Sequence, residues 1–67
     1  MSSTYYVTPS PRMPGRFDLR QARYAEQLRA GREHPHDLMA TGFTGQDMRD
    51  LVAKHFPDTD LTALDTP

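Results

Sequence analysis

The stretch Gly15-Arg16-Phe17-Asp18-Leu19-Arg20-Gln21 decides the fold, because two local structures compete for it. Asp18 with Gln21 three residues later is a variant of the capping box that opens a helix. The same stretch could instead return as the second strand of a hairpin, with residues 10–14 as its loop. We favour the helix, since residues 20–30 are rich in Ala, Leu, Arg, Gln and Glu, which are good helix formers.

This first helix is predicted over about residues 19–30. Gly31 is a natural position for the chain to leave a helix, because glycine accepts a left-handed backbone at low cost. Arg29 and Arg32 stand beside it, where positive charge complements the negative end of the helix dipole.

The residues before this helix resist helix formation. Pro9, Pro11 and Pro14 fix the backbone in extended conformations, so residues 1–16 are predicted to form an extended or flexible arm. Residues 4–8, Thr-Tyr-Tyr-Val-Thr, are prone to form a strand. An α+β fold with residues 4–8 as a strand or hairpin is therefore the alternative.

The second half of the chain carries a clearer helical pattern. Thr44 is a candidate N-cap, and apolar residues recur at helical spacing from Met48 until Pro57 ends the helix. Short helical turns are expected at residues 37–41, and again after a cap at Asp58 or Thr59.

Together these patterns predict a mainly α fold, a small bundle of two main helices and one or two short helical turns behind an extended Pro-rich N-terminal arm. The domain is expected over residues 17–64, with a frayed tail at 65–67. The predicted core consists of Ala22, Ala25, Leu28, Leu38, Met39, Phe43, Met48, Leu51, Val52, Phe56, Leu61 and Leu64.

Composition excludes several classes of protein. The chain has 67 residues, 36% of them hydrophobic, and no cysteine. Disulfide scaffolds, cysteine zinc fingers and thiol enzymes are therefore excluded. No apolar run is long enough to span a membrane, and the N-terminus lacks the features of a secretory signal, so a cytoplasmic location is expected.

Charge is distributed unevenly along the chain. The first 33 residues hold six arginines and three acidic residues, a net charge of +3. Residues 34–67 hold two basic residues and six aspartates, a net charge of −4. Such a layout can steer a charged partner to one face, or draw the two halves together.

Metal binding and catalysis find little support in the sequence. His34 and His36 flank a proline, where the geometry of a metal site is unspecified, and no cysteine is present to complete one. The serines lie near the N-terminus without an evident base. We therefore expect that the protein is not an enzyme, that it has no catalytic residues and that it binds no metal or cofactor.

The function that remains is docking on another macromolecule. The run Tyr5-Tyr6-Val7 can add a strand to a partner sheet or insert aromatic anchors into a groove, and the arginines suit an acidic surface. We expect a small non-enzymatic regulator or inhibitor that binds another protein, of the kind carried by phages and plasmids, with its oligomeric state left open. The candidate partner-binding residues are Tyr5, Tyr6, Arg12, Arg16, Arg20 and Arg23.

The alternative is a small DNA-binding regulator that uses the arginine-rich arm and the first helix. Residues 38–56 have a faint helix-turn-helix outline, and residues 16–20 could form the strand of a ribbon-helix-helix dimer. Asp47 and Asp50 argue against the former, because they would face phosphates with the wrong charge.

Overall fold

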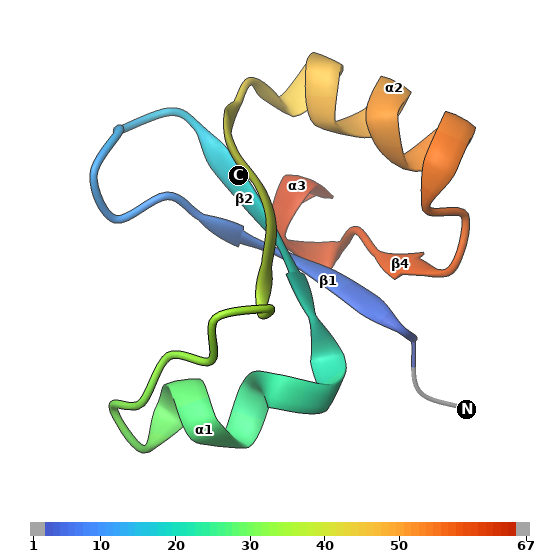
Figure 1. The fold of residues 1–67 in the computed structure, drawn as a ribbon. Helices are drawn as coiled ribbons and strands as arrows, with labels where there is room; N and C mark the ends of the chain where they lie inside the picture. The colour runs from blue at the N-terminus through green and yellow to red at the C-terminus, as the bar shows by residue number, and fades with distance from the viewer. Residues whose placement is uncertain (1–2, 66–67) are drawn as a thin grey trace.

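The computed structural model describes residues 3–65 and contains a four-stranded mixed sheet. Its strands are, from one edge to the other, β3 (Leu38–Phe43), β2 (Phe17–Gln21), β1 (Tyr5–Pro9) and β4 (Thr59–Asp60). Helix α2 (Gly45–His55) lies on one side of the sheet and α1 (Ala25–Arg29) at the opposite side (Figure 1). The fold is therefore α+β, and the predicted mainly α bundle is wrong.

A β-hairpin forms the centre of this sheet. Strand β1 (Tyr5–Pro9) pairs antiparallel with β2 (Phe17–Gln21), and Val7 lies opposite Leu19. Residues 10–16 form the hairpin loop, which is closed by a 2.9 Å hydrogen bond from the Ser10 amide to the Arg16 carbonyl. The alternative with residues 4–8 in a hairpin strand thus describes this region better than the helical interpretation.

The capping-box interpretation of Asp18 is wrong because its side chain has other partners. Asp18 lies inside β2 and is 3% exposed. Its Oδ1 accepts hydrogen bonds from Thr41 Oγ1 at 2.7 Å and from the Gly42 amide at 3.3 Å. Both donors belong to β3, so a contact across the sheet prevails over the local helix signal.

The predicted helix over residues 19–30 is much shorter in the structure. A 3-10 turn, η1 (Ala22–Tyr24), leads into α1 (Ala25–Arg29). Gly31 ends this helix as predicted, with φ of 80° and its amide bonded to the Leu28 carbonyl at 3.0 Å.

The predicted helical turn at residues 37–41 is also wrong. These residues lead into β3 (Leu38–Phe43), which pairs antiparallel with β2 and forms one edge of the sheet. Gly42 has φ of 77°, a left-handed conformation that other residues rarely adopt.

The second predicted helix is confirmed as α2 (Gly45–His55). The Thr44 side chain accepts a hydrogen bond from the Asp47 amide at 3.2 Å, which confirms Thr44 as the N-cap. Asp47 also lies in the first turn, where its charge favours the helix dipole.

After α2 the chain returns to the sheet at its other edge. Strand β4 (Thr59–Asp60) runs parallel to β1, and α3 (Thr62–Asp65) follows it. Asp58, a predicted helix cap, instead accepts hydrogen bonds from the amide and hydroxyl of Thr4. Asp60 accepts from the Thr62 amide at 2.9 Å. Of the predicted tail, Asp65 ends α3, and residues 66–67 lie outside the described residues.

The hydrophobic core lies between α2 and the sheet face that carries Val7 and Leu19. Met48 and Val52 of α2 complete its buried centre, and both were predicted. Five further predicted residues are partly buried against this centre: Phe43, Leu51, Phe56, Leu61 and Leu64.

The rest of the predicted core is wrong. Leu38 and Met39 are 39% and 41% exposed, because β3 lies at the sheet edge. Ala22, Ala25 and Leu28 are only half-buried and lie outside the core cluster. Their places are taken by strand residues, chiefly Val7 and Leu19.

Candidate functional site

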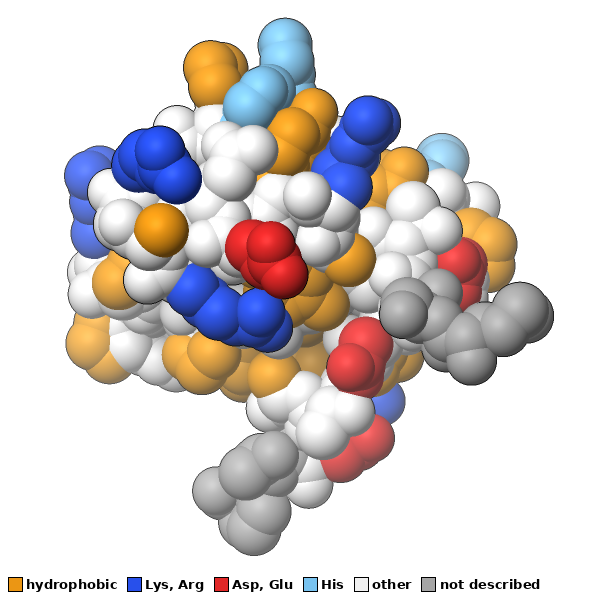
Figure 2. Space-filling model, turned by 90° about the horizontal axis from the view of Figure 1, so that it is seen from below, with side chains coloured by type: hydrophobic (Ala, Val, Ile, Leu, Met, Phe, Trp, Pro, Cys, Tyr) orange, Lys and Arg blue, Asp and Glu red, His pale blue; other side chains and the backbone are white. Residues whose placement is uncertain are grey.

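The sheet face opposite α2 carries polar and charged side chains and is hollowed beside β3. A groove of about 390 Å³ lies between the hairpin loop and β3. Figure 2 shows the molecule from the side of α1, with basic and acidic side chains next to each other in the middle of this view. The residues that line the groove are Ser10, Pro11, Arg12, Met13, Asp18, Arg20, Glu33, Leu38 and Thr41.

At the base of this groove the charges neutralise each other. The Arg20 guanidinium lies 2.7 Å from the Asp37 carboxylate and 3.3 Å from that of Glu33. Burial alone would lower the pKa of Arg20, but its hydrogen bonds to these two carboxylates raise it above the ordinary value. Arg20 is therefore held charged inside the protein and serves to join β2 to the segment before β3.

Two arginines, which together form a basic rim beside the groove, remain open to a ligand: Arg12 lines the groove, and Arg16 lies against β3 without belonging to the lining. Arg12 and Arg16 lie in the exposed hairpin loop. Arg16 donates one hydrogen bond to the Gly42 carbonyl at 3.2 Å. Arg12 forms no hydrogen bond or ion pair with any residue in the described range 3–65. Both guanidiniums therefore keep donors free beside β3.

Strand β3 is a free edge. Its inner side pairs with β2, and among residues 3–65 no strand lies on its outer side. The strand has six residues, Leu-Met-Ala-Thr-Gly-Phe, with neither a charge nor a proline. Charges and prolines are the usual means by which proteins prevent an edge from pairing with another chain.

Exposed apolar side chains accompany this edge. Leu38 and Met39 belong to β3, and Met13, at 41% exposure, reaches it from the hairpin loop. A Cβ built on Gly42 would lie 2.8 Å from the Met13 methyl group, so Met13 rests directly on β3. The unpaired edge of β3 thus lies beside a groove whose lining includes the apolar side chains of Met13 and Leu38 and the basic side chain of Arg12, while Met39 lies outside that lining.

The opposite edge of the sheet is different. Strand β4 has two residues and directly follows Pro57 and Asp58. An edge this short offers few backbone groups to a further strand.

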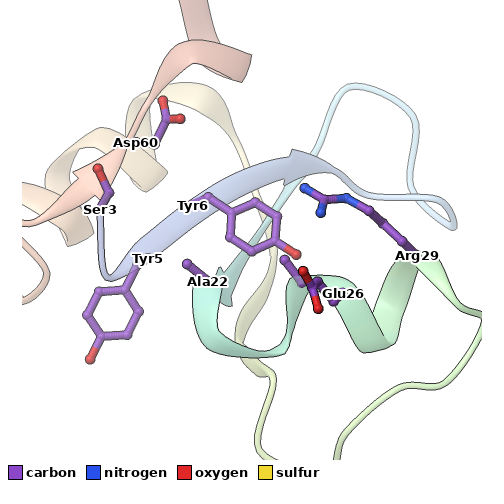
Figure 3. A pocket seen from close by; sticks show the side chains of 8 residues that line it. Ser3, Tyr5, Tyr6, Ala22, Glu26, Arg29 and Asp60 are labelled. Carbon is purple, nitrogen blue, oxygen red and sulfur yellow. The ribbon is translucent and has the colours of Figure 1, made fainter. Parts of the chain in front are cut away.

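A second pocket, of about 540 Å³, lies between β1, β4 and α1 (Figure 3). Tyr6, Glu26 and Arg29 point toward one another in it. Burial, and next the negative charge of Asp37, raise the pKa of Tyr6, while Arg20 and Arg29 oppose this shift. Within the described range, no hydroxyl group lining this pocket is hydrogen-bonded to a side chain that could act as a base.

The six predicted partner-binding residues are dispersed over the molecule. Tyr5 and Tyr6 are neighbours in β1, but Tyr5 packs edge-on against Phe56 with ring centroids 4.9 Å apart, while Tyr6 faces α1. Their side chains therefore leave the strand on different sides, as expected for successive residues.

The predicted arginines separate in the same way. Arg12 and Arg16 lie together in the hairpin loop, whereas Arg20 is buried in β2. Arg23 is exposed in η1, with its guanidinium carbon 5.4 Å from the ring centre of Tyr24. Arg20 and Arg23 thus do not share one exposed helix face.

Sequence reasoning missed the edge residues Leu38 and Met39, which it assigned to the core. The uncharged run of residues 38–46 was the available signal. An uncharged run alone does not distinguish a buried segment from an exposed edge, so this signal needs the strand order to be interpreted.

The histidine segment before β3 is engaged in local contacts. His34 stacks on Tyr24 with centroids 3.9 Å apart, and its Nδ1 accepts from the His36 amide at 3.0 Å. No group of three or more potential metal ligands is found within residues 3–65. No helix in that range is long and apolar enough to traverse a lipid bilayer.

Comparison with protein-family models, with curated protein sequences and with solved structures gives no match for this chain.

Proposed function

We propose that this chain is a small non-enzymatic binding protein, a regulator or inhibitor that accepts an extended segment of another protein at the free edge of β3. The observation that carries the proposal is the edge itself: six uncharged residues, unpaired on one side, with Leu38 and Met39 exposed. Strand addition to such an edge gains backbone hydrogen bonds, and nearby side chains supply specificity.

Two further features support docking. The exposed apolar residues Met13, Leu38 and Met39 lie around one strand, where a partner would bury them. The small size of the chain and its uneven distribution of charge also suit the cytoplasmic regulator that the sequence predicts.

The proposal is tested with the tagged full chain and two lysine variants. Met39→Lys places a charge on the edge, and Ala53→Lys places the same charge at an exposed position of α2. Both variants should keep the circular dichroism of the parent. A partner retained from a nuclease-treated bacterial lysate should bind Met39→Lys about tenfold more weakly or worse, and Ala53→Lys unchanged.

A partner that binds Met39→Lys as tightly as the parent would show that β3 is not the docking edge. Retention of nucleic acid alone, lost after nuclease treatment and at high salt, would instead favour the DNA-binding alternative.

A further inference from the structure

We propose that the segment accepted by β3 is acidic, so that its carboxylates meet the basic rim formed by Arg12 and Arg16. This inference rests on the proposed docking at β3 and specifies the chemistry of the partner. It follows from which charges of the groove are already engaged and which are free.

The acidic groups in and behind the groove are paired with other residues of the protein, except that the Asp37 Oδ1 is buried without a hydrogen-bond partner, out of reach of a ligand. Asp18 accepts hydrogen bonds from Thr41 and Gly42, and Glu33 is ion-paired with Arg20. The Asp37 carboxylate behind them is fully buried against Arg20. A basic partner segment would therefore find few carboxylates free to receive it.

The basic groups of the rim are free. Arg12 has no polar partner among the described residues, and Arg16 makes one contact, to a backbone carbonyl. Met13 lies between them in the loop and rests on β3. A strand added beside β3 would thus direct alternate side chains toward two guanidiniums and an apolar thioether.

Glutamate suits this surface particularly well. Its aliphatic stem can cover Met13 and Leu38, and its carboxylate can accept from a guanidinium, which offers paired donors in a planar fork. The opposite side chains of the added strand would point away from the groove. An extended segment with alternating acidic and apolar residues therefore matches the site.

The test uses the isotopically labelled full chain and three short peptides in which valine alternates with glutamate, glutamine or lysine. If a bound peptide shifts along β3 by one residue, its valines and its polar side chains exchange faces. Each peptide can therefore present its polar side chains to the groove, and the test assumes no particular register. We expect the glutamate peptide to perturb the amide signals of β3 and to bind about tenfold more tightly than the lysine peptide.

Two double variants test whether the basic rim causes the preference for the glutamate peptide. The double variant Arg12→Gln with Arg16→Gln should abolish the difference between the glutamate and lysine peptides. The matched control, Arg49→Gln with Lys54→Gln, removes the same charge from exposed positions of α2 and should preserve it. A preference that survives in the rim variant would overturn the inference.

The remaining outcomes separate the two proposals. Equal binding of all three peptides at β3 would overturn the acidic preference and leave docking at β3 intact. If no peptide perturbs β3, both proposals fail. A dimer that pairs through β3 would identify a second copy of this chain as the occupant, and tighter binding of a DNA duplex by the hairpin loop would identify nucleic acid; each would overturn the inference.

Discussion

Arg20 shows how one side chain can hold separate parts of the chain together. It is 7% exposed, and its contact with the fully buried Asp37 joins β2 to the segment before β3. A buried charge that loses its partner is strongly destabilising, whereas replacing both partners by apolar residues is often tolerated. Removal of one partner should therefore destabilise the domain more than replacement of both partners by apolar residues.

Arg20→Ala should lower the free energy of unfolding by about 3–5 kcal/mol, because the fully buried Asp37 side chain then loses its ion-pair partner. Arg20→Met combined with Asp37→Leu should recover much of this loss. Urea denaturation measures both, with exposed Arg23→Ala as a control that changes stability by less than about 0.5 kcal/mol. If Arg20→Ala and the double variant lower the free energy of unfolding equally, the loss does not come from leaving Asp37 without its partner.

Tyr6 should make the stability of the domain depend on alkaline pH. Burial, with the nearby charge of Asp37, raises its pKa above the ordinary 10.0, so folding favours the neutral phenol. Its contribution is fully present below about pH 10 and is lost as the pH rises through the higher value in the folded protein. The absorbance titration of the parent minus that of Tyr6→Phe should show a midpoint above 10.0, and a midpoint at or below it would contradict this environment.

Strand β2 is one of the elements that sequence patterns misassigned, and its central residue tests the fold directly. Leu19 is fully buried, whereas Leu38 in β3 is 39% exposed. Leu19→Ala should cost about 2–5 kcal/mol, which is enough to unfold much of a domain this small. Leu38→Ala should cost less than about 0.5 kcal/mol. Thermal denaturation compares the two, and the reverse order would favour the helical bundle.

Helix α2 depends on its cap. Thr44 accepts the Asp47 amide, which otherwise has no partner within the first turn. Thr44→Ala should lower the free energy of unfolding by about 1 kcal/mol, and Thr44→Ser should largely preserve it. Chemical denaturation gives both values; an equal effect of the two substitutions would show that the hydroxyl is not what stabilises this end.

At the scale of the whole molecule, the N-terminal residues belong to the interior. Strand β1 lies between β2 and β4 and supplies Val7 to the core. Deletion of residues 1–16 should therefore leave an unfolded chain, because it removes an inner strand and its apolar contacts. Circular dichroism of a 17–67 fragment tests this, and a cooperative melting transition in that fragment would contradict the strand order.

The arrangement of the whole molecule explains which parts of the candidate site were predictable. The sequence indicated that Arg12 and Arg16 would lie in an extended, exposed segment, and both are exposed in the hairpin loop. It could not place them beside β3, because that neighbourhood depends on a hairpin and on pairing between β2 and β3. Arg20, which the sequence analysis grouped with them, is instead buried and ion-paired with Asp37.

The sequence by itself determined the features that depend on neighbours within one or two helical turns. It identified α2 with its Thr44 cap, the end of α1 at Gly31 and the apolar face that carries Met48 and Val52. Tertiary structure decided the state of residues 17–21 and 38–43. Their local preferences are weak, and backbone pairing, burial of Leu19 and the cross-strand contacts of Asp18 together outweigh the gain from a short helix.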